Sequence, residues 1–73
     1  MEYIALPKYV KQMRKQYRLR QVDLSEKSGV GLRFIRELEQ GKQSLRMDKV
    51  NQVINLFGTE LAPVPMDRSK WLS

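Results

Sequence analysis

The sequence contains no cysteine and no histidine. Without cysteine, the chain forms neither a disulfide nor a thiolate metal site. Without histidine, it lacks the side chain that most often acts as a general base and as a nitrogen ligand for metals. Catalysis would depend on carboxylates or lysine alone, and no catalytic constellation stands out among the 73 residues. We therefore expect a protein that is not an enzyme and that holds no cofactor and no metal.

Long apolar runs are also missing, since none approaches the roughly 20 residues that span a bilayer. The N-terminal stretch MEYIALPKYVKQ lacks the order of a basic and then an apolar region that marks a signal peptide. We therefore expect a cytoplasmic protein without a membrane partner. The 73 residues leave room for one small domain, and a second copy or another partner that binds the folded form would stabilise it.

Acidic residues are in the minority, 8 against 14 lysines and arginines, which gives a net charge of +6. One stretch without acids holds six of the basic residues: Lys8, Lys11, Arg14, Lys15, Arg18 and Arg20. A later basic group, interleaved with Glu37 and Glu39, consists of Arg33, Arg36, Lys42 and Arg46. This concentration predicts a polyanionic partner, either nucleic acid or an anionic surface. The alternative is a soluble protein whose basic strip only keeps it in solution.

Apolar residues recur at helical spacing through most of the chain. Leu6, Val10, Met13 and Tyr17 share one face, as do Met47, Val50, Val53, Ile54 and Phe57 further on. The pattern predicts four helices, at residues 7–17, 21–28, 32–40 and 47–57. Glycines at positions 29, 41 and 58 follow the last three, where a left-handed cap is expected. The fold class is therefore all-α.

The character of the chain changes after Gly58. The segment TELAPVPM, residues 59–66, has two prolines within three residues, which predicts an extended segment or an edge strand. The last seven residues, DRSKWLS, predict a flexible tail that is polar except for Trp71 and Leu72. The expected organisation is a helical domain at 1–58, the extended segment at 59–66 and the tail at 67–73.

Two short helices joined by a glycine-containing turn are typical of a helix-turn-helix. The positions that shape this unit hold a small residue, a glycine and apolar residues, as the motif requires: Leu24, Ser25, Gly29, Val30, Ile35 and Leu38. Ser25 is small where the two helices cross, and Gly29 tolerates the positive φ of the turn. A dinucleotide-binding loop is excluded, because it needs a preceding strand and a third glycine where Phe34 stands.

The stretch QVDLSEKSGVGLRFIRELEQGK resembles the Xre-type, lambda-repressor-like helix-turn-helix family, and the resemblance covers residues 8–58. It implies a repressor that binds a palindromic operator in double-stranded DNA as a homodimer, with the helix at 32–40 in the major groove. The implied location is the bacterial cytoplasm, associated with the nucleoid when the protein is bound. The implied base contacts are Leu32, Arg33, Arg36 and Glu37. The implied phosphate contacts are Arg20, Gln21, Lys42, Ser44 and Arg46.

The chain departs from the family pattern at three positions. Arg20 and Gly31 stand where hydroxyl caps are usual, and glycine is poorer there by about 1 kcal/mol or less. Leu32 stands where a polar base reader is common. The base-contact set also has an alternative reading as a solvated helix face with internal ion pairs. We expect Glu39 to pair with a basic residue such as Arg14 rather than to contact a base, and Phe34 to pack at the edge of the core.

The layout of four helices followed by a short strand, with SLRMDKVNQVINLFGTEL at residues 44–61, resembles the HipB-like antitoxins. That resemblance implies an autorepressor and antitoxin of a toxin–antitoxin operon, with a kinase-like toxin as partner. A homodimer would form by pairing of the extended segments, with Phe57, Leu61 and Val64 at the interface. Trp71 and Leu72 either anchor the toxin or fold back onto their own domain.

Two other functions remain open from the sequence. One is a stand-alone Xre-type repressor of a phage or mobile element, without a toxin partner. The other is a protein-interaction module that has kept the fold and lost DNA binding. The salt dependence of DNA binding separates the repressors from the interaction module.

Overall fold

Residues 4–65 are described by the structure, a computed structural model. Their regular elements are α1 (Leu6–Gln16), α2 (Gln21–Ser28), α3 (Leu32–Gln40), α4 (Met47–Ile54) and the 3-10 helix η1 (Asn55–Phe57). The prediction of an all-α domain with four helices is therefore confirmed. The predictions for Trp71 and Leu72 lie outside the described residues.

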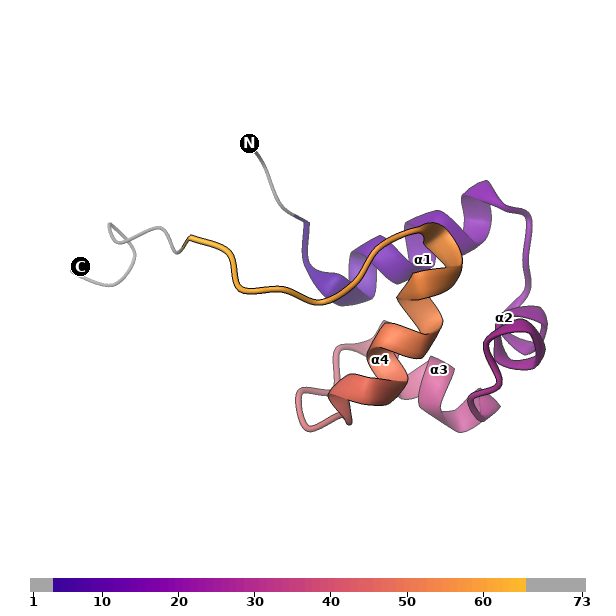
Figure 1. Cartoon of the computed structure of the whole chain (residues 1–73). Helices are drawn as coiled ribbons and strands as arrows, with labels where there is room; N and C mark the ends of the chain where they lie inside the picture. Colours follow the sequence, from indigo (N-terminus) through magenta and orange to yellow (C-terminus); the bar gives the residue numbers. More distant parts are fainter. Residues whose placement is uncertain (1–3, 66–73) are drawn as a thin grey trace.

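The core forms where α3 packs against α1 and α2, and where α4 packs against α2 (Figure 1). Eight buried apolar residues make it up: Val10, Leu24, Val30, Ile35, Leu38, Val50, Val53 and Ile54. Phe34 packs at the edge of this core, as predicted. Met47 does not join it: the first residue of α4 is exposed, although its spacing places it on the inner stripe. The stripe of α4 therefore begins at Val50.

A buried ion pair joins α1 to α3. The Nε of Arg14 lies 2.8 Å from Oε2 of Glu39, and the two side chains are only 13% and 2% exposed. The guanidinium also donates to the other carboxylate oxygen, at 3.1 Å, and to the carbonyl of Leu19, at 2.9 Å. The predicted pairing of Glu39 with Arg14 is confirmed, and it fixes the orientation of α3 on the domain.

The helix ends follow the glycines closely. Gly29, Gly41 and Gly58 all adopt positive φ, as predicted for left-handed caps. The fourth helix is shorter than predicted, because its final turn, Asn55–Phe57, tightens into a 3-10 helix. The first helix ends at Gln16, and Arg18 takes up a left-handed conformation with φ of 57°. The amide of Leu19 then donates to the carbonyl of Arg14, at 2.9 Å, which closes that helix end without a glycine.

The segment after Gly58 runs back along α1 toward its N-terminal end (Figure 1). Within residues 4–65 it forms no β-strand. It is tied to the domain at two points: the Thr59 hydroxyl accepts from Tyr9, at 3.0 Å, and the Leu61 amide donates to Asn51, at 2.7 Å. Residues 62–65 are exposed, so the extended stretch begins anchored and ends free of the core.

Candidate nucleic-acid interface

The turn between α2 and α3 fixes where α3 begins. The Ser25 hydroxyl donates to the carbonyl of Val30, at 2.6 Å, so the small residue at the helix crossing also holds the turn. Gln52 of α4 donates to the carbonyl of Ser28, at 2.7 Å. A Cβ on Gly29 would lie 3.0 Å from that same amide nitrogen, and φ there is +79°. Geometry and crowding therefore both favour glycine at position 29.

Helix α3 is strongly two-sided. Ile35 and Leu38 are buried in the core, while Arg33 and Arg36 are exposed on the opposite face. Leu32 is half-buried at the start of the helix. The helix therefore presents a polar surface from a rigid support, which is the arrangement that a groove-reading helix needs.

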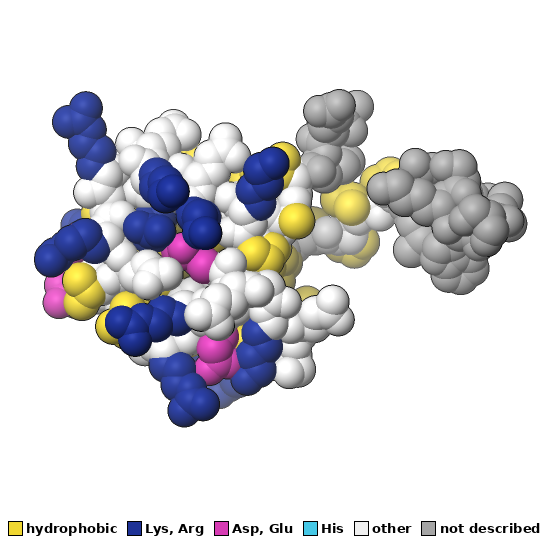
Figure 2. All heavy atoms as spheres, turned by 180° about the vertical axis from the view of Figure 1, so that it is seen from behind, with side chains coloured by type: hydrophobic (Ala, Val, Ile, Leu, Met, Phe, Trp, Pro, Cys, Tyr) yellow, Lys and Arg dark blue, Asp and Glu magenta, His cyan; other side chains and the backbone are white. Residues whose placement is uncertain are grey.

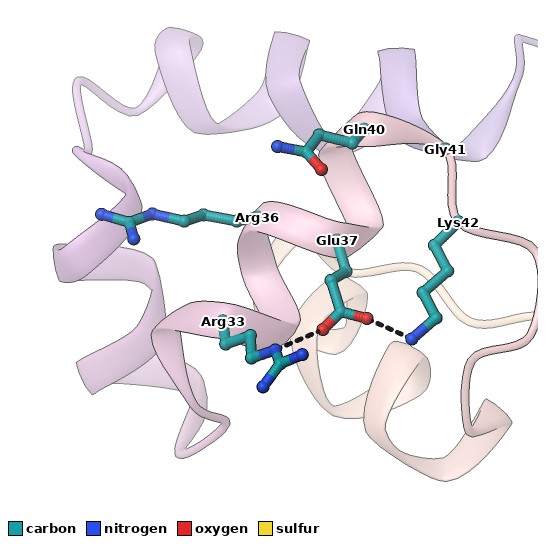
Figure 3. A pocket seen from close by; sticks show the side chains of 6 residues that line it. All are labelled: Arg33, Arg36, Glu37, Gln40, Gly41 and Lys42. Carbon is teal, nitrogen blue, oxygen red and sulfur yellow. Dashed lines mark hydrogen bonds and ion pairs between the residues drawn. The ribbon is translucent and has the colours of Figure 1, made fainter.

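Three of the four predicted base-contact residues line one open hollow, which Figure 3 shows from close by. The hollow is lined by Arg33, Arg36, Glu37, Gln40, Gly41 and Lys42. Leu32 does not line it. Gln40 belongs to this surface and was not predicted from the sequence, although its spacing of four residues from Arg36 places it on the same helix face. The hollow therefore joins α3 to the start of the loop that follows it.

Glu37 lies at the centre of this surface and bridges two cations (Figure 3). Its Oε1 accepts from Nε of Arg33, at 3.0 Å, and its Oε2 pairs with the ammonium of Lys42. The hydrogen bond from Lys42, with a smaller contribution from Arg33, holds the pKa of the Glu37 carboxyl below its ordinary value. Within residues 4–65, Arg36 forms no ion pair, and its side chain points away from Glu37 (Figure 3).

The N-terminus of α2 is closed by Asp23. The Arg20 backbone amide donates to Oδ2 of Asp23, at 2.7 Å, and the guanidinium of Arg20 donates to both carboxylate oxygens, at 3.1 and 3.0 Å. These bonds, the guanidinium first, lower the pKa of Asp23. Arg20 supplies no acceptor to the first-turn amides, as expected of a poorer cap, and Asp23 instead accepts the backbone amide of Arg20 from three residues on.

The remaining predicted phosphate contacts differ in their surroundings. Gln21 is half-buried, and its amide donates inward to Glu39, at 3.3 Å. Ser44 is exposed in the loop before α4. Arg46 is the N-cap of α4, and it pairs with Asp48 at 2.7 Å. The guanidinium of Arg46 in turn lowers the pKa of Asp48.

Lysine and arginine side chains spread over the face of the domain that Figure 2 shows, with a few acidic side chains among them. Four of the five ion pairs of residues 4–65 lie at the surface. In three of these, an acid neutralises a predicted phosphate contact: Arg20, Lys42 or Arg46. Solvent weakens such pairs to roughly 0–1 kcal/mol each, so an incoming polyanion displaces each of them at a cost of that order.

Among residues 4–65, no group of three or more acidic side chains is placed to hold a metal ion. None of the helices in this range has the length and apolar character that crossing a membrane requires.

The fold and this surface define a helix-turn-helix domain. Residues 10–64 match the model of the helix-turn-helix family, and the chain belongs to that family. The chain is also 44% identical, over 52 residues, to a protein named uncharacterized HTH-type transcriptional regulator y4mF of Sinorhizobium fredii (strain NBRC 101917 / NGR234). The match covers 71% of this chain and 68% of that protein.

Proposed function

We propose that this protein is a sequence-specific DNA-binding transcriptional regulator that places α3 in the major groove. The observation that carries the proposal is the two-sided α3, which is held by Ile35 and Leu38 and presents Arg33, Arg36 and Glu37 outward. The regulator's name borne by the relative from Sinorhizobium fredii supports the same function.

The exposed side chains of α3 have the chemistry of base readers. Arg36 is the best placed to bond guanine O6 and N7, because no acid in residues 4–65 holds its guanidinium. Arg33 is the second candidate for guanine, and Glu37 has the acceptors that suit cytosine N4. Leu32, at the start of the helix, would touch a thymine methyl group.

The phosphate contacts would surround this reading helix. Arg20 and Gln21 lie at the N-terminus of α2, where backbone amides also favour an anion. Lys42, Ser44 and Arg46 lie in the loop between α3 and α4. These residues would position the domain on the duplex without reading its sequence.

A homodimer on a palindromic operator is the assembly that we propose. Support comes from an apolar hollow at the N-terminal end of α1, where Ile4 and Val64 are exposed and Leu61 is half-buried. Pairing of residues 62–65 with their symmetry mates would cover it. Phe57 would contribute less than its sequence position implies, because it packs within its own domain against the rings of Tyr9 and Tyr17.

The more specific role that we propose is autorepression and antitoxin action in a toxin–antitoxin operon, with a kinase-like toxin as partner. The anchored exit of the chain at Thr59 and Leu61, followed by exposed residues, fits a HipB-like layout. Co-expression with the product of the neighbouring reading frame, followed by gel filtration, tests this role. A neighbouring frame that encodes no kinase-like protein would favour a stand-alone repressor.

The DNA-binding proposal is tested with the DNA upstream of the protein's own gene. We expect binding to weaken by about 10³–10⁵ between 50 and 200 mM salt if a dimer makes 6–10 phosphate contacts. Weak binding with a flat salt dependence would favour an interaction module instead.

The reading residues are tested on the same DNA. Arg36→Ala should relax the preference at one base position and weaken binding there by about 1–3 kcal/mol. Ser44→Ala is a control, because loss of a phosphate contact weakens binding to all sequences alike. An equal loss on every sequence for Arg36→Ala would reassign Arg36 to phosphate binding.

A further inference from the structure

Glu37 is enclosed by the two cations it bridges. Its side chain is 23% exposed, whereas that of Arg33 is 92% exposed and that of Lys42 is 49% exposed. The carboxylate is therefore the shielded centre of the cluster, and the two cations are its outer members. A polyanion that approaches α3 meets the cations before it meets the acid.

The backbone builds this cluster. Gly41 takes a left-handed conformation, and the amide of Lys42 then donates to the carbonyl of Glu37, at 3.1 Å. The turn therefore directs Lys42 back toward the outer face of α3. The Lys42–Glu37 pair follows from the fixed course of the chain around the helix end.

Helix stability is a weak reason for the cluster. An ion pair between residues four apart on a helix contributes about 0.2–0.5 kcal/mol, and a base that precedes its acid is the less favourable order. Arg33 precedes Glu37 in this pair. The position of Glu37 amid the proposed reading residues points instead to a role in recognition.

We infer that Glu37 determines specificity by competing with DNA phosphates for Arg33 and Lys42, which weakens binding to non-cognate duplex. The inference rests on the proposed function. On random DNA, both cations reach phosphates only by leaving the carboxylate without donors beside a negative backbone. On a cognate site, cytosine N4 supplies a donor to Glu37 while guanine accepts from Arg33, so every group is satisfied. Discrimination thus arises from a repulsive element as well as an attractive one.

The experiment compares Glu37→Gln with Glu60→Gln. Each variant removes one negative charge from the chain, but Glu60 borders the hollow at the N-terminal end of α1 and forms no ion pair within residues 4–65. Sedimentation equilibrium verifies that Glu60→Gln dimerises like the wild type. The probe is a random-sequence duplex with a fluorescent label, and anisotropy is followed through a salt series. Glutamine keeps the shape of glutamate, and circular dichroism verifies that both variants are folded.

We expect Glu37→Gln to bind the random duplex about five- to tenfold more tightly than the wild type, because two cations are released to phosphates. The slope of log K against log salt should steepen by about 1–2 for each protomer bound, at roughly 0.9 for each phosphate neutralised. Glu60→Gln should change affinity less than twofold and leave the slope unaltered. In a background of Arg33→Ala and Lys42→Ala, Glu37→Gln should lose most of its effect.

Equal gains for Glu37→Gln and Glu60→Gln would overturn the inference, since net charge alone would then explain them. A persistent gain in the Arg33→Ala, Lys42→Ala background would overturn it as well. Either result leaves the proposed function standing, because the wild type still binds DNA. A wild type that binds neither the random duplex nor its own upstream DNA at 50 mM salt would overturn both.

Discussion

Arg18 is the one residue other than glycine with positive φ among those described, at 57°. A left-handed conformation costs an L-residue with a Cβ about 1–2 kcal/mol, and glycine avoids this cost. The chain accepts it where α1 turns toward α2, and Arg18 is exposed there. The position therefore stores local strain that a substitution can release.

Arg18→Gly should raise the melting temperature by several degrees, because relief of the strain exceeds the roughly 0.5–1 kcal/mol of extra unfolded-chain entropy. About 1 kcal/mol corresponds to about 4–8 °C in a domain of this size. Thermal denaturation followed by circular dichroism measures the shift. Lys15→Gly removes the same charge from regular α1 and should lower the melting temperature. A fall for both variants would contradict the account of Arg18.

Unlike the strained Arg18, the buried Arg14 and Glu39 cost little stability, because each charge is paired with the other. Glu39→Gln should lower the free energy of unfolding by about 3 kcal/mol, since a buried guanidinium is left without its counter-charge. Urea denaturation measures the change. Glu26→Gln, at an exposed site on α2, should stay within about 0.5 kcal/mol of the wild type. If Glu39→Gln lowered the free energy of unfolding as little as Glu26→Gln does, Arg14 would have found another partner.

At the scale of elements, α2 depends on an acid in its first turn. Asp23 accepts the amide and the guanidinium of Arg20, and its pKa is lowered in the folded state. A carboxyl whose folded pKa is depressed stabilises the protein above its unfolded pKa of about 3.9. That stabilisation is lost as the pH falls through the folded value. Glu37 and Asp48 act in the same direction, because their pKa values are also lowered.

Asp23→Asn should therefore lower the melting temperature at pH 7. On acidification, the melting temperature of this variant should fall less than that of the wild type. The difference from wild type should shrink as the pH drops below about 4, the pKa of the unfolded carboxyl, and should vanish below the lower pKa of the folded state. Melting curves between pH 3 and pH 7 test this expectation. Glu26→Gln, which removes a neighbouring acid, is the control. Its melting temperature should exceed that of Asp23→Asn by more at neutral pH than at acidic pH. A constant difference from wild type at every pH would contradict a role for the Asp23 charge.

The helices were predictable from the sequence because each signal is local. Apolar spacing located α1 and α4, and glycines 29, 41 and 58 located three helix ends. The sequence also indicated a partner for Glu39, since a buried acid needs a counter-charge. These predictions require only neighbours along the chain and the rule that buried polar groups are satisfied.

The features that were not predicted depend on which side chains the folded chain brings into contact. Asp23 is a capping acceptor only because Arg20 offers both an amide and a guanidinium. Lys42 reaches Glu37 only because Gly41 turns the chain at the end of α3. Met47 fits the apolar stripe by spacing, yet it lies at the first position of α4, where the helix has only begun to contact the core.

At the scale of the whole molecule, four of the five exposed large apolar residues among residues 4–65 gather at two separate places, and Met47 lies at neither. Val64 and Ile4 border the hollow at the N-terminal end of α1. Tyr17 and Leu56 border a second hollow beside Phe57. The proposed dimer uses the first place, so the second supplies a matched control.

Val64→Ser should raise the dimer dissociation constant about a hundredfold, because two valines each lose about 1.5 kcal/mol of burial. Sedimentation equilibrium measures the constant, and an unchanged melting curve at low concentration shows that the domain is intact. Leu56→Ser should leave dimerisation unaltered. Weaker dimers with Leu56→Ser alone would move the interface to the second hollow. Substitution is preferable to truncation at Thr59, because Thr59 and Leu61 are bonded into the domain.

The bonds at Thr59 have a consequence for the phasing of two copies along a DNA duplex. The hydroxyl of Thr59 accepts from Tyr9 and donates to the carbonyl of Ile54, both at 3.0 Å, so the exit of the chain is fixed to the body that carries α3. In the proposed dimer, the distance between the two reading helices is then set by this junction, while α3 sets which bases are read. Residues inserted after Leu61 would leave each half-site sequence unchanged and shift the spacing of half-sites that is bound best.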